Sequence, residues 1–201
     1  MSDEGTRFTE ADLAPERGDT RRVVLERLAV VVAVLAGGVV VGGLVALGAC
    51  AAPFVFRLTP APFSGDAMGS AFARFDQIAI GACVAMLAAE VLRTWLDRRA
   101  RRAVAPRIRR FAAVLMAGAA AYIGLVLTPA INGLHRAGVQ RGVGADGEEL
   151  DRIHKRAESF GKAEVVLAVV AVALHVATVR GRRDDDEDED AVAPAPPGGE
   201  G

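Results

Sequence analysis

The sequence predicts an all-α fold, an integral membrane four-helix up-down bundle built of two helical hairpins, with disordered termini. Residues 28–56 and 111–134 carry no formal charge, and each stretch exceeds the roughly 20 residues that cross a bilayer as a helix. Shorter apolar stretches, 77–89 and 165–179, alternate with them. The charges that flank the shorter stretches must snorkel, form pairs or face the inside of a bundle. Four crossings leave little of the 201 residues for a separate soluble domain.

The predicted helices cover most of the chain, at about 23–56, 67–98, 107–131 and 147–180. The arm before them, residues 1–21, mixes charge, glycine and proline without periodicity, so it cannot bury enough apolar surface to become ordered. The tail, residues 184–201, combines a run of acidic residues with an Ala/Pro/Gly-rich end. We expect the arm and the tail to be disordered and to lie in the cytoplasm.

Turn and capping residues mark the helix ends in order. The first helix ends shortly after Pro53, where neighbouring helices can satisfy the freed carbonyl. Ser64 can cap the second helix, and Pro106 is a good first-turn residue for the third, which ends near Pro129. The fourth helix starts near Asp146, outside the apolar stretch. Each half thus has a long glycine-bearing helix, a proline exit and a shorter helix, which indicates either a parallel repeat or shared membrane patterning.

The distribution of arginine predicts the orientation of the helices. The second connection, around residues 93–110, is crowded with arginines, whereas the first carries only Arg57 and Arg74. The excess of positive charge places the second connection, and with it both termini, in the cytoplasm. Membrane flanks account for these arginines, so we expect the lipid bilayer as the partner and no nucleic acid. The Ala/Arg/Gly/Val bias favours a bacterial cytoplasmic (inner) membrane.

Small residues on the first helix predict a close helix contact. Gly38 and Gly42 make a small-xxx-small pair, which lets two backbones approach closely. We interpret this pair as packing within the bundle, with a homodimer as the alternative.

Three acidic residues within the helices are candidates for a structural or ion-conducting role: Asp76, Glu90 and Glu164. Asp76 and Glu90 share one helix face, because they lie fourteen residues apart with Cys83 midway between them. Carboxylates in a membrane are costly and usually have partners. We expect an ion-pair belt with Arg57, Arg74 and Lys162 as counter-ions; a path for protons or cations is the alternative.

A second group of candidates lies on the outer part of the fourth helix. Asp151, His154 and Glu158 are three and four residues apart, so they can reach one ion on the same helix face. The interpretation that we favour is a polar extension whose histidine and acids pair with Arg57, Arg136 and Arg152, so that no metal is bound. We also expect no cofactor and no catalytic residues, because neither a nucleophile motif nor a phosphate-binding loop is present.

The first hairpin carries three recognisable motifs: the glycine-rich stretch 43–48, Ala52–Arg57 (APFVFR) and Gly69–Phe75 (GSAFARF). With a partial match around His154, they resemble domain-of-unknown-function family 4149, which is similar to the eukaryotic transmembrane protein 205. It implies a four-helix integral membrane protein without a settled activity. A distant resemblance to copper-resistance D proteins does not extend to their intramembrane histidines, which the first three predicted helices lack.

Together these observations predict a non-enzymatic polytopic membrane protein, such as a scaffold or a stress-tolerance component. A small ion- or proton-coupled transporter or a metal-handling membrane protein is the alternative.

Overall fold

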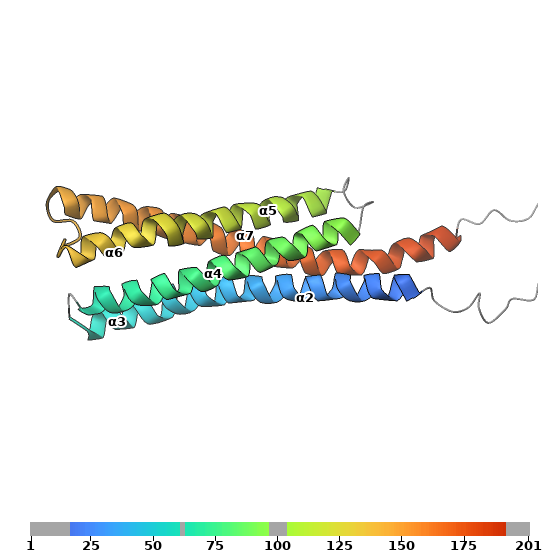
Figure 1. Ribbon diagram of the computed structural model, residues 1–201, viewed down its shortest axis with the longest axis horizontal. Helices are drawn as coiled ribbons and strands as arrows, with labels where there is room; N and C mark the ends of the chain where they lie inside the picture. Colours follow the sequence, from blue (N-terminus) through green and yellow to red (C-terminus); the bar gives the residue numbers. More distant parts are fainter. Residues whose placement is uncertain (1–16, 61–62, 97–103, 192–201) are drawn as a thin grey trace, which may run out of the picture.

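The computed structural model describes residues 17–60, 63–96 and 104–191, and it is helical almost throughout. The elements are α2 (Arg17–Val45), a π-helical stretch (Ala46–Ala51), α3 (Ala52–Leu58), α4 (Phe63–Leu96), α5 (Val104–Tyr122), a second π-helical stretch (Ile123–Leu127), α6 (Thr128–Arg136) and α7 (Gly144–Ala191). Because α3 continues α2 and α6 continues α5, they form four rods (Figure 1).

Four helical segments of the described chain are long and apolar enough to cross a membrane: Arg21–Leu58, Phe63–Leu96, Val104–Arg136 and Gly144–Val179. This finding confirms the predicted all-α four-helix fold and indicates a membrane protein. The rods run alternately up and down (Figure 1). We call the end that holds the α3–α4 and α6–α7 turns the loop end, and the end where α2 and α5 begin the terminal end.

The packing of the rods places two helices on a diagonal of the bundle. α2 packs against α4 and α7, and α5 packs against the same two helices. The order around the bundle is therefore α2, α4, α5 and α7, so α4 and α7 face each other across its axis. Both run from the loop end to the terminal end, and side chains from either helix can meet in the centre (Figure 1).

Both π-helical stretches end two residues before a proline. The first ends at Ala51, ahead of Pro53, and the second at Leu127, ahead of Pro129. Proline lacks an N–H and its ring crowds the carbonyl four residues earlier, so the preceding turn widens to avoid the clash. The two halves of the chain thus share this local feature, in agreement with the predicted repeat.

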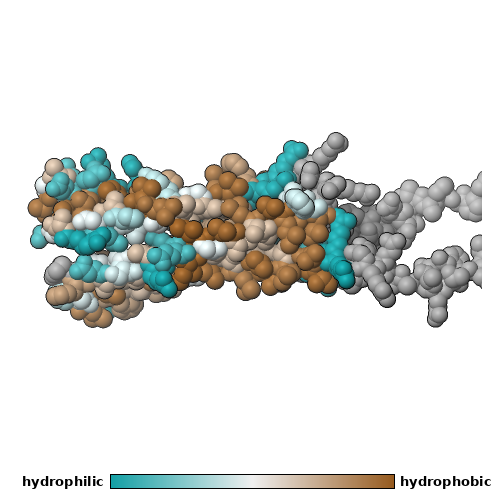
Figure 2. Space-filling model, in the orientation of Figure 1, coloured by the Kyte–Doolittle hydropathy of each residue, from teal (hydrophilic) through white to brown (hydrophobic). Residues whose placement is uncertain are grey.

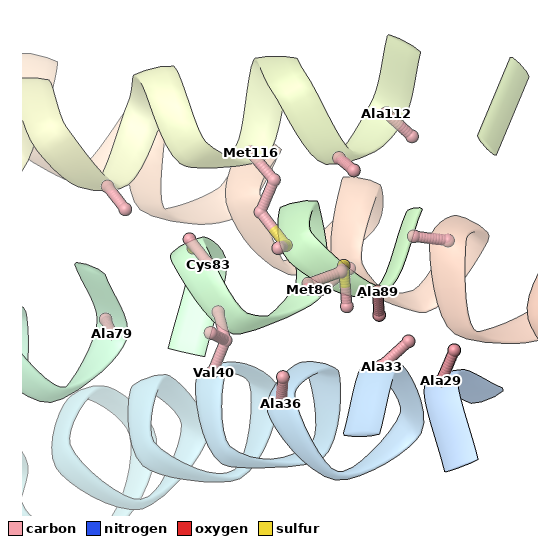
Figure 3. Packing of buried hydrophobic residues seen from close by; sticks show 14 of the residues in the cluster. Ala29, Ala33, Ala36, Val40, Ala79, Cys83, Met86, Ala89, Ala112 and Met116 are labelled. Atoms are coloured by element: carbon pink, nitrogen blue, oxygen red, sulfur yellow. The ribbon is translucent and has the colours of Figure 1, made fainter. Parts of the chain in front are cut away.

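Small residues let the helices approach closely in the core. Alanines line the buried face of α2, and Met86 and Met116 reach between the helices from α4 and α5 (Figure 3). Large apolar residues such as Leu35 and Phe111 are exposed on the outside instead. Apolar residues cover the broad middle of the face in Figure 2, and hydrophilic residues gather towards its two ends. This distribution is the one expected where lipid surrounds the bundle.

The helix contact predicted at Gly38 and Gly42 is wrong for packing within the chain. A Cβ atom added at either position would meet nothing within 4 Å. The close approaches occur one residue away on either side, where a Cβ at Gly37 would meet Val172 and a Cβ at Gly43 would clash with the Phe75 ring. Consecutive residues of a helix point about 100° apart. Gly38 and Gly42 therefore lie on a face that points away from the bundle, although each is next to a glycine that points inward.

The fourth helix is longer at both ends than the sequence indicated. α7 begins at Gly144 and continues to Ala191, rather than covering 147–180. The helix as described includes the acidic run, residues 184–190, and the predicted disorder of the tail stays a prediction. Residues 17–21 of the predicted arm are likewise helical. The rest of the predicted arm and tail, residues 1–16 and 192–201, lies outside the described residues.

Replacing Gly43 by leucine should destabilise the bundle, because its side chain would displace the Phe75 ring that lies against this glycine. Overpacking of this kind costs about 1–3 kcal/mol. Gly81→Leu on α4 is the matched control, since a Cβ atom there would meet nothing within 4 Å. Thermal unfolding of the two detergent-purified variants measures the difference. Equal loss of stability in both variants would contradict this assignment of the packing face.

Candidate functional site

A buried group of polar residues joins all four rods near the terminal end. We call it the terminal cluster; its members are Glu26 on α2, Glu90 and Arg93 on α4, Arg109 on α5, and His175 and Thr178 on α7. Glu90, Arg93, Arg109 and His175 are all buried. Such a concentration of buried charge is expensive in a membrane unless each group has a partner.

Glu90 is the centre of the terminal cluster. Its Oε1 accepts a hydrogen bond from Arg109 Nε at 2.5 Å and lies 2.6 Å from His175 Nε2. Arg93 Nη2 lies 3.7 Å from Glu26 Oε1, which extends the cluster to α2. One carboxylate on α4 therefore faces partners from both α5 and α7.

Thr178 connects the two arginines of the cluster. Its Oγ1 accepts hydrogen bonds from Arg109 Nη1 at 2.8 Å and from Arg93 Nη2 at 3.3 Å. The same hydroxyl donates to the Leu174 carbonyl at 2.7 Å. A single hydroxyl thus uses its two lone pairs and its proton, which is its full hydrogen-bonding capacity.

The contacts of His175 assign its tautomer. Arg93 Nη1 lies 3.0 Å from His175 Nδ1, and a guanidinium nitrogen can only donate. Nδ1 must therefore accept, so the proton of a neutral ring is on Nε2, which faces Glu90 Oε1. The assignment follows from hydrogen-bonding chemistry. With His175 neutral, two arginines balance two glutamates, and the cluster carries no net charge.

The spacing of the residues explains how the cluster assembles. Glu90 and Arg93 are one turn apart on α4, and His175 and Thr178 are one turn apart on α7, so each pair shares a helix face. Arg109 lies in the second turn of α5, where it points inward although its neighbour Arg107 is exposed. Among these residues only Glu90 was a candidate from the sequence. An i, i+3 pair of polar residues within an apolar helix was the signal that could have found His175 and Thr178.

A second set of buried polar residues lies nearer the middle of the bundle. Thr128 Oγ1 donates to Asp76 Oδ2 at 2.6 Å. Gly124 allows this approach, since a Cβ there would lie 3.0 Å from the Asp76 Cβ. On α7, Glu164 is 2% exposed, and its Oε1 has no hydrogen-bond partner. Asp76 is close enough to Glu164 to act on it electrostatically.

The counter-ions that the sequence suggested for Asp76 and Glu164 lie elsewhere. Arg57 is exposed and lies over the Phe54 ring, with its Cζ 5.5 Å from the ring centroid. The Arg74 guanidinium donates to Gln77 at 3.0 Å, and the Lys162 ammonium pairs with Glu158 at 2.7 Å. Long basic side chains can reach water from these positions, so the predicted ion-pair belt does not form around these two acids.

The candidate metal ligands near the loop end are occupied by other contacts. Asp151 pairs with Arg141 and Lys155, each at 2.6 Å. His154 Nε2 lies 3.4 Å from His135 Nε2, and Glu158 is the partner of Lys162 described above. In the described parts of the chain, no three His, Cys, Asp or Glu side chains are grouped so that they could hold a metal ion. The acids thus pair with Arg141 and two lysines rather than with the predicted Arg57, Arg136 and Arg152, and the absence of a bound metal stays a prediction.

Comparison with curated proteins and with solved structures gave no match. A family model described as a domain of unknown function (DUF4149) matches residues 35–140. The matched part contains Asp76, Glu90, Arg93 and Arg109, whereas α7, with Glu164 and His175, follows it. The likeness to transmembrane protein 205 and to copper-resistance D proteins stays a prediction. The match spans more than half of the chain, which therefore belongs to the DUF4149 family.

Proposed function

We propose that the protein is a non-enzymatic integral membrane scaffold of the bacterial cytoplasmic membrane, with both termini in the cytoplasm. The observation that carries this proposal is the terminal cluster. Its two arginines and two glutamates balance one another, and its histidine and threonine make their contacts within the same group. A site that binds a charged substrate needs charge that is left over for the substrate, and this balanced cluster offers none.

The cluster favours a single arrangement of the four helices. Apolar helices in lipid can slide and rotate at little cost, because lipid chains are as apolar as their side chains. Removing one partner of a buried ion pair, by contrast, leaves an uncompensated charge. Each helix therefore has one register in which the cluster is complete, and a fixed register is what a scaffold requires.

A basic residue at the end of α4 supports the proposed orientation. Arg22 donates to the Leu96 carbonyl, so a basic residue of α2 lies at the end of α4 beside the arginine-rich second connection. Positive charge of this kind favours the cytoplasmic side.

The exposed Gly38 and Gly42 on α2 leave a smooth face, which supports a homodimer as the form in which a scaffold could assemble.

Topology reporters test the orientation. Fusions after Arg102 and after Arg183 should report the cytoplasm, and fusions near Gly65 and Gly142 should report the outside, because the dense arginine block holds the second connection inside. Reporter activity of a cytoplasmic and of an external enzyme, measured on the same four fusion sites, gives the result. A cytoplasmic signal near Gly65 would reverse the proposed orientation.

A double-mutant cycle tests the role of the terminal cluster. Glu90→Gln should lower the free energy of unfolding by about 3–5 kcal/mol, because Arg109 loses the charge that compensates it. The double variant Glu90→Gln/Arg109→Gln should lose less free energy of unfolding than the two single variants lose in sum, since the pair is coupled. Denaturant titration of the purified protein in micelles measures each value.

Glu158→Gln is the matched control for this cycle, because Glu158 is exposed and its pair with Lys162 should contribute about 0–1 kcal/mol. If Glu90→Gln were no more destabilising than Glu158→Gln, the cluster would not hold the bundle together and the scaffold proposal would lose its support.

A further inference from the structure

We propose that Asp76 and Glu164 form a proton-binding site in the middle of the bundle, in which Glu164 holds an exchangeable proton. This inference goes beyond the scaffold proposal and does not depend on it. It rests on the burial of the two carboxyl groups, on their position in the bundle, and on the absence of a cation beside them in the described part of the chain.

Both carboxyl groups are removed from solvent, but their hydrogen bonds differ. Asp76 is 7% exposed and Glu164 is 2% exposed. Asp76 Oδ2 accepts the hydroxyl of Thr128, whereas Glu164 Oε1 has no hydrogen-bond partner. An ionised carboxylate needs several donors when it is buried, so Glu164 is the one of the two that is left to hold the proton.

The register of α4 and α7 places the two acids at nearly the same depth. The Glu90–His175 contact and the Arg93–Thr178 hydrogen bond each join residues 85 positions apart. Because the two helices run in parallel, the same offset sets Glu164 level with Ala79. At about 1.5 Å per residue, this level is roughly 4.5 Å along the axis from Asp76. The two carboxyl groups therefore approach from opposite corners of the bundle and lie close in height.

The helices around this level carry no inward-facing cation. α2 has no charged residue between Arg27 and Arg57, and the third rod has none between Arg110 and Arg136. On α4 the nearest basic residue, Arg74, is exposed, and on α7 Lys162 is 75% exposed in its side chain and paired with Glu158. Two further titratable groups lie near this level, the thiol of Cys83 on α4 and the hydroxyl of Tyr122 on α5, whose ring packs on Phe160 one turn from Glu164. Neither group adds a positive charge.

The contrast with the terminal cluster shows what the missing cations imply. Glu90 is as buried as Glu164 and also has one oxygen, Oε2, without a hydrogen-bond partner, but its Oε1 is compensated by Arg109. At Asp76 and Glu164, two negative charges would lie at nearly the same depth of an apolar interior, where even one unpaired ion costs several kcal/mol. Binding a proton removes one charge, and like charges of this kind share protons rather than ionise together. A proton is thus the ligand that the site fits.

Infrared spectroscopy of the full chain in lipid nanodiscs at neutral pH tests this site. A protonated carboxyl group has a carbonyl band that an ionised group lacks, and this band shifts in D₂O. We expect the wild-type protein to show such a band and Glu164→Gln to lose it. The control Glu158→Gln should retain it, because Glu158 is an exposed, ion-paired carboxylate.

Two further measurements support the infrared test, and the second of them uses the wild-type protein alone. In the first, Glu164→Gln should unfold at nearly the wild-type temperature, because an amide is a close substitute for a neutral carboxyl group. Labelling of the wild-type protein with ¹³C-glutamate should shift the acid band, whereas ¹³C-aspartate should not. The labelling keeps the proposal testable should Glu164→Gln fail to fold.

Three results would overturn the proposal. The first is the absence of a D₂O-sensitive acid band from the wild-type protein at neutral pH. The second is an acid band that persists in both Glu164→Gln and Asp76→Asn. The third is a loss of the wild-type band on addition of Na⁺ at constant pH, which would identify a monovalent metal cation as the preferred ligand.

Discussion

The cost of burying charge in an apolar bundle is the constraint on which the rest of this structure depends. Every buried ionisable group must find a partner of opposite charge or become neutral. The chain uses the first solution at the terminal end, where arginines from two helices meet two glutamates. Nearer the middle lie two further buried acids, Asp76 and Glu164, beside which the described helices carry no inward-facing cation. Core packing adapts to both regions, because alanine, glycine and methionine leave room for the polar side chains.

Much of the fold could be predicted from the sequence because membrane crossing imposes a simple rule. An uncharged stretch that is longer than a bilayer is thick must be a helix, as at residues 28–56 and 111–134. The two shorter apolar stretches that alternate with them, 77–89 and 165–179, complete an up-down bundle. The rotation of each helix about its own axis was harder to predict from the sequence. Both faces of α2 are apolar where it crosses, so no contrast in polarity indicates which glycines face inward. Gly38 and Gly42 and their neighbours Gly37 and Gly43 are equivalent by composition, and only the contacts with Phe75 and Val172 distinguish them.

The interaction partners of the candidate site residues were also hard to predict from the sequence. Asp76, Glu90 and Glu164 were identifiable because a charged residue in an apolar helix is conspicuous. Their partners were not, since the contacts of Glu90 join residues far apart in the sequence, such as His175. The basic residues nearest to the other two acids by depth were the natural candidates, but these long side chains turn outward. Choosing between an inward and an outward basic residue requires the packing of neighbouring helices, which a single sequence does not contain.

The two π-helical stretches have a consequence for how changes in the chain are tolerated. A π-helical turn holds one residue more than the α-helical turn around it, so it behaves like a local insertion that has been absorbed without unfolding the rod. The segment beyond it is rotated relative to the segment before it. As a result, α3 and α6 keep faces of their own, independent of those of α2 and α5. In the first and third rods, the face presented at the loop end is therefore set separately from the face presented at the terminal end, where the ion pairs lie.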